Sequence, residues 1–337
     1  MKKMLILFIL GMLVFSYADL IVPQPRPAKP VLVPDNKPVP TPQPPFAPKP
    51  NIKPVMPAPA PKYTDHENLN AVLWMQTSAE FKGLCYQAYN TAKIMLDVAL
   101  KDKTWCADLE QLEKKGYENL KPAVILDIDE TVLDNTIYQG SLIREHKAYN
   151  SREWDNWCRE VRATAIAGAA DFCNYAVKKG VDVVYLTNRR NTIQKETEEN
   201  LIKEGFPVTQ AKAENTTPAK NHHKSFFGKF MKREQEGKAY VLPKVKERTK
   251  NGRRQAVAED HRIIMLVGDN CCDFSGLFND TTIKAREEAA VKYASFWGTK
   301  WIILPNPSYG DWENSVLDNK YPKQDERLKM KYDLLRK

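Results

Sequence analysis

Acidic side chains gather where three apolar runs of the sequence end. Asp127 and Asp129 flank one residue at the end of the first run, and Thr187 follows the second. Asp269 closes the third run, and Asp273 lies four residues further on. An Asp-x-Asp pair on its own also suits the cap of a following helix. Because each of the three run ends carries a carboxylate, a hydroxyl or both, we expect these side chains to form one site.

These residue types suit the transfer of a phosphoryl group. A phosphate monoester is anionic and repels a carboxylate nucleophile, so a divalent cation must neutralise its charge. Mg²⁺ prefers oxygen ligands, and Asp127, Asp269 and a backbone carbonyl would supply them. Attack of one carboxylate on phosphorus would form an aspartyl-phosphate, and the second would protonate the leaving oxygen and later deprotonate water. Thr187, nearby backbone N–H groups and one lysine would hold the phosphoryl oxygens.

The elements that must position this site can be read from apolar spacing. Four short apolar runs alternate with helix-like stretches, over residues 123–128, 181–186, 263–267 and 301–304. Such runs predict a parallel sheet covered by helices on both faces. Ligands bind beyond the carboxyl ends of the strands in sheets of this kind. Before the first run, apolar residues at helical spacing predict a helix over residues 68–100, with Asp65 as its N-cap.

The N-terminus is typical of an exported protein. Residues 1–18 carry two lysines, an apolar run and small residues before a cleavage site, which predicts a signal peptide. The run is shorter than the ~20 residues of a membrane span, although an uncleaved anchor is the alternative. No cysteine follows it for lipid attachment. We therefore expect the protein in the periplasm or cell envelope.

A proline-rich linker is predicted over residues 19–62, before a catalytic domain over residues 63–337. Residues 22–61 hold 16 of the 23 prolines and should sample extended polyproline II. The segment would act as a spacer that tethers the domain to a membrane or wall. The alternative is a dispensable linker.

The positive charge is confined to two segments. Of the net charge of +9, residues 1–61 carry about +5 and residues 212–254 about +9, which leaves the rest acidic. The positive charge thus belongs to two segments and is not spread over a binding face, which disfavours nucleic-acid binding. We interpret residues 212–245 as a basic insertion, in which His222 and His223 suit solvent better than a metal. The six cysteines permit disulfides, but their spacing does not reveal any pairing.

Four ordered motifs resemble one family. They are Leu-Asn-Ala-Val-Leu-Trp-Met-Gln-Thr-Ser-Ala-Glu (69–80), Ile-Leu-Asp-Ile-Asp-Glu-Thr-Val-Leu-Asp-Asn-Thr-Ile-Tyr (125–138), Ile-Met-Leu-Val-Gly-Asp-Asn-Cys-Cys-Asp-Phe (264–274) and Leu-Pro-Asn-Pro-Ser-Tyr-Gly-Asp-Trp-Glu (304–313). Together they resemble the class C acid phosphatases of the haloacid dehalogenase (HAD) superfamily, especially the bacterial lipoprotein 5′-nucleotidases, over roughly residues 65–325. The resemblance implies an α/β fold, a three-layer HAD-like Rossmannoid parallel sheet with an α-helical lid built from N-terminal and C-terminal segments.

The resemblance also implies a role for each acidic residue. Asp127 would be the nucleophile and a metal ligand, and Asp129 the acid/base that also offers Mg²⁺ its backbone carbonyl. Asp269 would be a further metal ligand, and Asp273 would orient a lysine and the metal waters. Thr187 would bind the phosphate.

The lysine of the family precedes the third strand in a Lys-x-x-Arg-Arg context, which Lys250 matches. A solvated lysine on a helix face is the alternative interpretation. Lys246 and Lys244 are the reserve candidates, because the neighbouring insertion makes the register uncertain.

Substrate contacts are also implied. Tyr309 lies in the motif whose aromatic residue stacks on the nucleobase in the nucleotidases, and Tyr149 occupies the place of a second aromatic. The alternative is that Tyr309 packs in the core beside Trp312. Asn188 and Arg189 are assigned to substrate binding because they follow the second strand.

The expected function is Mg²⁺-dependent hydrolysis of small phosphate esters, with nucleoside 5′-monophosphates favoured. A broad-specificity acid phosphatase or phosphotransferase is the first alternative, because the same intermediate serves both reactions. A non-catalytic, envelope-tethered binding module is the second. Whether the chain forms a homo-oligomer stays open. The chain departs from the family pattern in lacking the lipid-attachment cysteine, in having Cys271 where leucine is usual, and in its basic insertion.

Overall fold

The computed structural model describes residues 66–209, 237–244, 249–279, 281–320 and 322–336. All of them belong to one compact unit, Tyr63–Lys337. The expected signal peptide, linker and most of the basic insertion lie outside the described residues and stay predictions. Within the described ranges, no helix is both long and apolar enough to cross a membrane. All six cysteines are described, and none forms a disulfide.

A five-stranded parallel sheet, in the order β5-β4-β1-β6-β7, forms the centre of the unit. Its strands are β1 (Lys121–Leu126), β4 (Asp182–Arg190), β5 (Ala239–Lys244), β6 (His261–Gly268) and β7 (Trp301–Ile303). In the register, Leu126 pairs with Tyr185 on one side and with Val267 on the other. The three central strands therefore end side by side. A small antiparallel pair, β2 (Leu133–Asp134) and β3 (Thr164–Ala165), follows β1.

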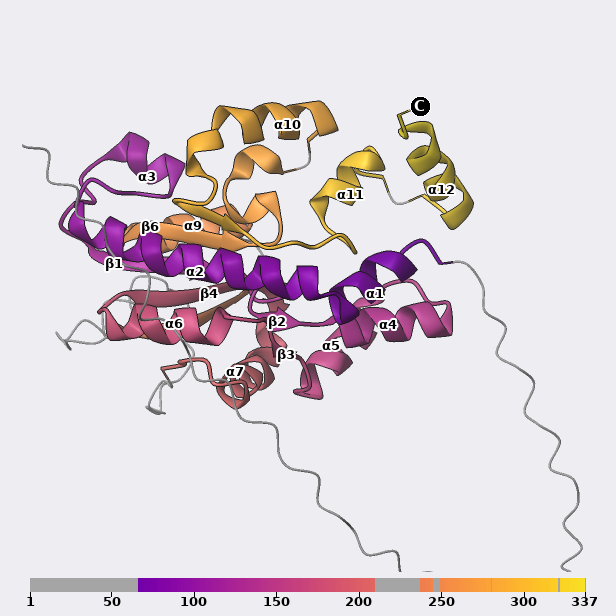
Figure 1. The fold of residues 1–337 in the computed structure, drawn as a ribbon, viewed down its shortest axis with the longest axis horizontal. Helices are drawn as coiled ribbons and strands as arrows, with labels where there is room; N and C mark the ends of the chain where they lie inside the picture. The colour runs from indigo at the N-terminus through magenta and orange to yellow at the C-terminus, as the bar shows by residue number, and fades with distance from the viewer. Residues whose placement is uncertain (1–65, 210–236, 245–248, 280, 321, 337) are drawn as a thin grey trace, which may run out of the picture. The chain divides into compact units, whose positions relative to one another are not determined.

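Helices connect the strands and extend beyond the sheet (Figure 1). The α-helices are α1 (Leu69–Thr77), α2 (Ala79–Lys101), α3 (Leu109–Lys114), α4 (Thr136–Glu145), α5 (Ser151–Arg159), α6 (Ala169–Lys178), α7 (Gln194–Lys203), α9 (Lys250–Ala258), α10 (Ile283–Lys292), α11 (Asp311–Val316) and α12 (Gln324–Asp333). Short 3-10 helices are η1 (Asn191–Ile193), η2 (Cys271–Asp273), η3 (Gly276–Phe278) and η4 (Ala294–Phe296).

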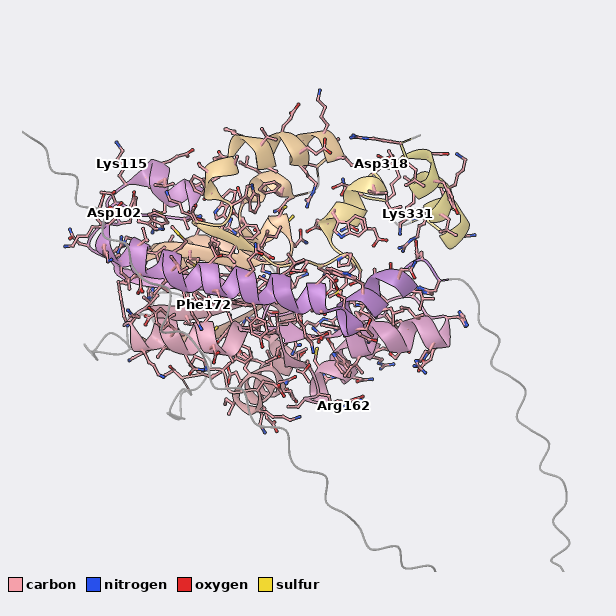
Figure 2. All side chains as sticks on the ribbon, viewed as in Figure 1. Asp102, Lys115, Arg162, Phe172, Asp318 and Lys331 are labelled. Atoms are coloured by element: carbon pink, nitrogen blue, oxygen red, sulfur yellow. The ribbon has the colours of Figure 1, made fainter. Side chains whose placement is uncertain are left out.

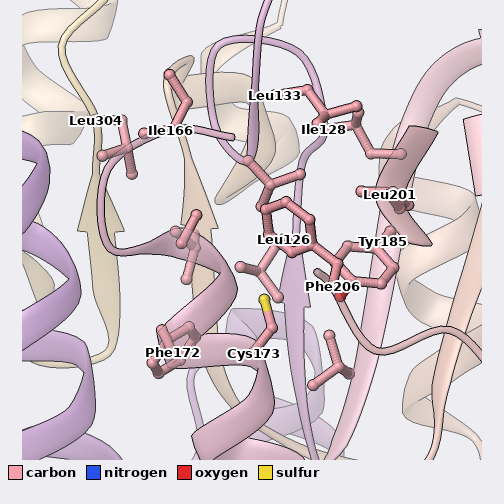
Figure 3. Close-up of a cluster of buried hydrophobic side chains, with 14 of the residues drawn as sticks. Leu126, Ile128, Leu133, Ile166, Phe172, Cys173, Tyr185, Leu201, Phe206 and Leu304 are labelled. Atoms are coloured by element: carbon pink, nitrogen blue, oxygen red, sulfur yellow. The ribbon is translucent and has the colours of Figure 1, made fainter. Parts of the chain in front are cut away.

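Two apolar cores cover the two faces of the sheet. Leu126 and Tyr185 face α2 and α6, where they join Phe172 in the larger core (Figure 3). Ile125 and its neighbours on the opposite face pack with Val257 of α9 in the smaller core. Because successive strand residues point to opposite faces, near-continuous apolar strands are buried on both sides. The expected sheet with helices on both faces is confirmed.

Two local features differ from the sequence expectation. The helix expected over residues 68–100 is divided into α1 and α2 at Ser78, which has extended backbone and whose hydroxyl accepts the N–H of Phe81. A serine side chain that caps a new helix competes with continuing the previous one. In addition, β5 lies inside the 212–245 stretch interpreted as an insertion, so the regular sheet resumes by Ala239.

Candidate active site

The carboxyl ends of β1, β4 and β6 bring the predicted site residues together. Asp127 and Asp129 follow β1, and Asp269 follows β6. The backbone N–H of Asp127 donates to the carbonyl of Val267 at 3.0 Å, which extends the ladder between the two strands by one residue. Parallel pairing therefore places two sequence-distant carboxylates at one edge of the sheet.

A lysine and three carboxylates form the centre of the site. Carboxylate oxygens of Asp127, Asp269 and Asp273 lie within 4.8 Å of one another. The Nζ of Lys250 donates to Oδ1 of Asp127 and to Oδ1 of Asp273, both at 2.6 Å. Lys250 is the first residue of α9, whose N-cap Thr249 accepts the N–H of Gly252. The cap thus directs the lysine into the acidic cluster.

Asp273 is held by the turn that follows β6. The backbone N–H of Asn270 donates to Oδ2 of Asp273 at 3.1 Å, and the Asn270 side chain accepts from the backbone in return, as a capping box. A Cβ at Gly268 would lie 2.2 Å from Oδ2 of Asp273. Only glycine permits this close approach, so the Gly-Asp-Asn sequence has a steric reason.

Burial and the crowding of carboxylates shift the pKa values of the site residues. Burial raises the pKa of Asp127 well above its usual value, Lys250 lowers it, and the neighbouring carboxylates raise it further. Burial, followed by the charge of Asp273, raises the pKa of Asp269 to about 7. Burial lowers the pKa of Lys250, but Asp127 and Asp273 outweigh it and raise the pKa above its ordinary value. The lysine is therefore cationic, and its single positive charge serves three crowded carboxyl groups.

Asp129 has a different set of partners. Its Oδ1 accepts from the Arg189 side chain, Nε at 3.0 Å and Nη2 at 2.8 Å, and from Nδ2 of Asn135 at 3.0 Å. Arg189 is 1% exposed. Asn135 in turn accepts from the indole N–H of Trp157. Arg189 therefore holds the Asp129 carboxylate in place, and its predicted contact with substrate stays a prediction.

Asp269 is oriented by two side chains from other loops. Its Oδ1 accepts from the Thr131 hydroxyl at 3.2 Å, and its Oδ2 accepts from Nδ2 of Asn306 at 2.8 Å. Glu130, next to Thr131, has a left-handed backbone with φ of 57° and is buried. This bend turns the chain sharply after Asp129. Burial raises the pKa of Glu130 well above its usual value.

Hydrogen bonds from α9 hold the end of β4 in place. Nη1 and Nη2 of Arg253 donate to the carbonyl of Thr187 and to Oδ1 of Asn188, at 2.5 and 2.8 Å. Thr187 is fully buried and does not line the cleft. Its hydroxyl accepts the N–H of Arg189. Asn188 is exposed on the cleft surface. The phosphate-binding role of Thr187 stays a prediction.

A cleft of ≈ 1680 Å³ opens above the carboxylates. Tyr149 and Tyr309 both line it, together with Asp127. Tyr149 is 63% exposed and its ring lies 6.5 Å from that of Trp154. Tyr309 is half-buried, while Trp312 is 42% exposed, so the two do not form a core pair. Both tyrosines are therefore available to a ligand.

The donor set fits a hard divalent cation. Asp127, Asp269 and Asp273 offer only oxygen ligands, and one lysine does not balance three carboxylates. Magnesium and similar ions take such ligands. Asp129, expected to offer its backbone carbonyl, does not bring its side chain into this cluster.

Several residues of the site were not predicted individually. Asn135 and Thr131 lie inside the second sequence motif, and Asn306 inside the last one, but nothing local identified their partners. Arg253 was noticed only as context for Lys250. Of the lysine candidates, Lys250 meets the carboxylates; Lys244 lines the cleft, and Lys246 lies outside the described residues.

Comparison with known proteins identifies the family. The family model for subfamily IIIB of the HAD superfamily, described as acid phosphatase, matches residues 50–312. A solved structure of the class C acid phosphatase from Bacillus anthracis is 34% identical, with 80% of this chain and 97% of that chain covered and a TM-score of 0.63. A structure of the Bacillus anthracis enzyme with tungstate bound is 33% identical, with the same coverage and a TM-score of 0.62.

These matches confirm the family and the fold that the four motifs implied. Phosphatases of this superfamily typically use a divalent metal, and the acidic cluster provides a place for one. The chain belongs to subfamily IIIB of the HAD superfamily and is a phosphomonoesterase of the acid phosphatase type.

Proposed function

We propose that the protein hydrolyses nucleoside 5′-monophosphates through an aspartyl-phosphate on Asp127, with Mg²⁺ as cofactor. The observation that carries the proposal is the contact of Lys250 with Asp127 and Asp273 at 2.6 Å each, beside Asp269. A carboxylate that faces a buried cation and a cleft is suited to attack an anionic phosphorus.

Each carboxylate can be given a distinct task. Asp127 attacks phosphorus and forms the acyl-phosphate, while the ester oxygen leaves. Lys250 lies against Asp127 and stabilises charge that develops on the phosphoryl oxygens. Asp273 keeps Lys250 in place through its Oδ1.

Asp129 serves as general acid and then general base. Within the described residues, its side-chain contacts with Arg189 and Asn135 all involve Oδ1, which leaves Oδ2 to carry the proton. Oδ2 donates this proton to the leaving oxygen, and then accepts one from the water that attacks the intermediate. The buried guanidinium of Arg189 restrains the carboxylate during both steps.

Asp127 and Asp269 are the proposed side-chain ligands of Mg²⁺, with the backbone carbonyl of Asp129 as a third ligand. When bound, the ion supplies charge neutralisation for the phosphoryl group and the nearby carboxylates. Thr131 and Asn306 hold Asp269 in the orientation required for a ligand.

Tyr149 and Tyr309 support a nucleoside as the leaving group. Both line the cleft that contains Asp127, and both expose aromatic surface. Stacking of a base on an aromatic side chain contributes about 1–3 kcal/mol in nucleic-acid sites. The tungstate complex of the Bacillus anthracis relative supports binding of a tetrahedral oxyanion in this family.

Asp127→Asn tests the proposed nucleophile. We expect kcat for adenosine monophosphate to fall at least about 1000-fold, because an amide cannot form the intermediate. Thermal unfolding and circular dichroism should show that the variant still folds. Asp260→Asn, an exposed aspartate that does not line the cleft, is the matched control. Turnover near the wild-type rate in Asp127→Asn would exclude the mechanism.

A further inference from the structure

Four charged side chains join the beginning and the end of the described chain beside the active-site cleft. Glu67 precedes α1, Glu313 lies on α11, and Arg327 and Lys331 lie on α12. The Nζ of Lys331 contacts Oε2 of Glu67 and Oε1 of Glu313, both at 2.5 Å. Nη2 of Arg327 contacts Oε1 of Glu67 at 3.2 Å and Oε1 of Glu313 at 3.0 Å. We call these four residues the clasp.

The clasp attaches α12 to the rest of the unit. None of the side chains described on α12 is buried, and Tyr332 is 72% exposed. Figure 2 labels Lys331 on this helix. The two glutamates, in contrast, are largely shielded: the Glu67 side chain is 15% exposed and that of Glu313 is 11% exposed. A network of two cations and two shielded carboxylates is stronger than an isolated surface pair. Leu328 and Met330 are half-buried, so the clasp and partial apolar packing together hold this helix in place.

The clasp is connected to the loop that carries Tyr309. Asn68, the neighbour of Glu67, donates through Nδ2 to the carbonyl of Ser308 at 2.9 Å. Ser308 immediately precedes Tyr309 and is 1% exposed. At the start of the same loop, Asn306 donates to Asp269 at 2.8 Å. The loop is therefore attached to the acidic cluster through Asn306, and through Ser308 to Asn68, the neighbour of the clasp residue Glu67.

The clasp also holds the segment that follows the loop. Glu313 lies on α11, which begins at Asp311, directly after Tyr309 and Gly310. Asp311 accepts from Nδ2 of Asn270 at 2.8 Å, which anchors α11 to the turn after β6. Tyr309 thus lies between two segments that Glu67 and Glu313 connect to α12.

We propose that the clasp is a positioning device that sets Tyr309 for the leaving group of the substrate. Glu67, Glu313 and Arg327 line the same cleft as Tyr309 and Asp127. Three of the four clasp residues lie beyond residues 50–312, which match the family model. Glu313 closes the last of the four motifs that resemble the family, so the clasp joins that motif to α12. This inference rests on the proposed nucleotide substrate.

Lys331→Gln tests the clasp without altering a residue that lines the cleft. We expect the KM for adenosine monophosphate to rise about 3- to 10-fold with little change in kcat, because positioning and not chemistry is weakened. Glycerol 2-phosphate, which has no ring, should show a much smaller change. Amide hydrogen exchange over residues 305–316 should become faster in the variant. Lys331→Arg should restore both properties.

Lys329→Gln is the matched control on the same helix, because Lys329 pairs with Asp333 at an exposed position. It should leave the KM and the exchange of residues 305–316 unchanged. Unchanged KM and unchanged exchange in Lys331→Gln would overturn the clasp proposal, as would equal effects from Lys329→Gln.

The proposed substrate is judged separately with Tyr309→Ala. If that variant treats the two esters alike, nucleotide preference fails, while hydrogen exchange in Lys331→Gln still decides whether the clasp positions the loop. If Tyr309→Ala impairs hydrolysis of adenosine monophosphate more than that of glycerol 2-phosphate, and Lys331→Gln affects both esters alike, the clasp proposal fails while the nucleotide preference stands.

Discussion

At the scale of single residues, the two carboxylates after β1 differ because their partners differ. Asp127 faces the amine of Lys250, whereas Asp129 faces the guanidinium of Arg189 and the amide of Asn135. A lysine amine is a compact charge that can also serve the phosphoryl group, while a guanidinium binds a carboxylate through two nitrogens and restrains it. The same residue type can therefore act as nucleophile in one position and as acid/base in the other.

Tyr309→Ala is the residue-scale test of substrate preference. We expect kcat/KM for adenosine monophosphate to fall about 5- to 100-fold, which corresponds to the loss of roughly 1–2.7 kcal/mol of stacking. Glycerol 2-phosphate should lose much less, because it has no ring to stack. Steady-state kinetics with both esters measures the difference. Tyr309→Phe, which retains the ring, should behave like the wild type. Equal losses for both esters in Tyr309→Ala would favour a broad-specificity acid phosphatase.

At the scale of elements, a second charged group joins the strands at the opposite end of the sheet. Asp182 begins β4 and is 2% exposed. It accepts from Lys121 of β1 at 2.6 Å, contacts Nε2 of His261 of β6 at 2.9 Å, and accepts the backbone N–H of Lys238 at 2.7 Å. Three neighbouring strands are therefore fastened by one carboxylate, far from the ends that carry the site.

Asp182→Asn should change how the free energy of unfolding depends on pH. Burial alone would raise the pKa of Asp182, but the hydrogen bonds from His261, Lys121 and Lys238 outweigh burial and lower the pKa below 3.8. The stabilisation is then complete above about pH 5 and is lost as the pH falls through the lowered pKa. We expect a deficit of about 1–3 kcal/mol in the free energy of unfolding at pH 7.

Urea unfolding of both proteins between pH 7 and pH 3 measures the deficit, which should shrink as the wild type loses its advantage. The activity of the folded variant should stay close to normal, because Asp182 does not line the cleft. A deficit that is constant with pH would show that the charge of Asp182 does not stabilise the sheet.

At the scale of the whole molecule, the site concentrates negative charge in a protein with a net charge of +9. Asp127 and the Asp269–Asp273 turn come from distant parts of the chain and meet only after folding. A divalent ion that binds them stabilises the folded state by mass action, about 2.7 kcal/mol at a concentration 100 times its Kd. Metal binding should therefore be visible in thermal unfolding as well as in activity.

Removal of metal with a chelator should lower the Tm by a few degrees and abolish hydrolysis, and added Mg²⁺ should restore both. Differential scanning calorimetry and an assay on the same samples provide the two readouts. Asp269→Asn, which weakens the ligand set, should show a smaller Tm response to Mg²⁺ than the wild type. If the Tm of the wild type does not change when Mg²⁺ is added, the assignment of the cluster as the metal site is contradicted.

The amino-acid sequence by itself determined the strands and the chemical type of the site. Four of the five sheet strands were predicted because strands buried on both faces are continuous apolar runs. Two of them, β1 and β6, end beside the acidic residues. The fifth, β5, was missed because it is an edge strand that contains Pro243 and adjoins a lysine-rich stretch. Edge strands need less apolar sequence and tolerate proline, so their signal is weak.

Only the tertiary structure decided which side chains meet. Arg189 and Asp129 lie 60 residues apart, and Lys331 and Glu67 lie 264 residues apart, so no local spacing relates them. Sequence periodicity predicts which face of an element is buried, because that depends on the element alone. Which charges become partners depends on how separate elements pack, and in this protein that packing provides both the support of Asp129 and the clasp.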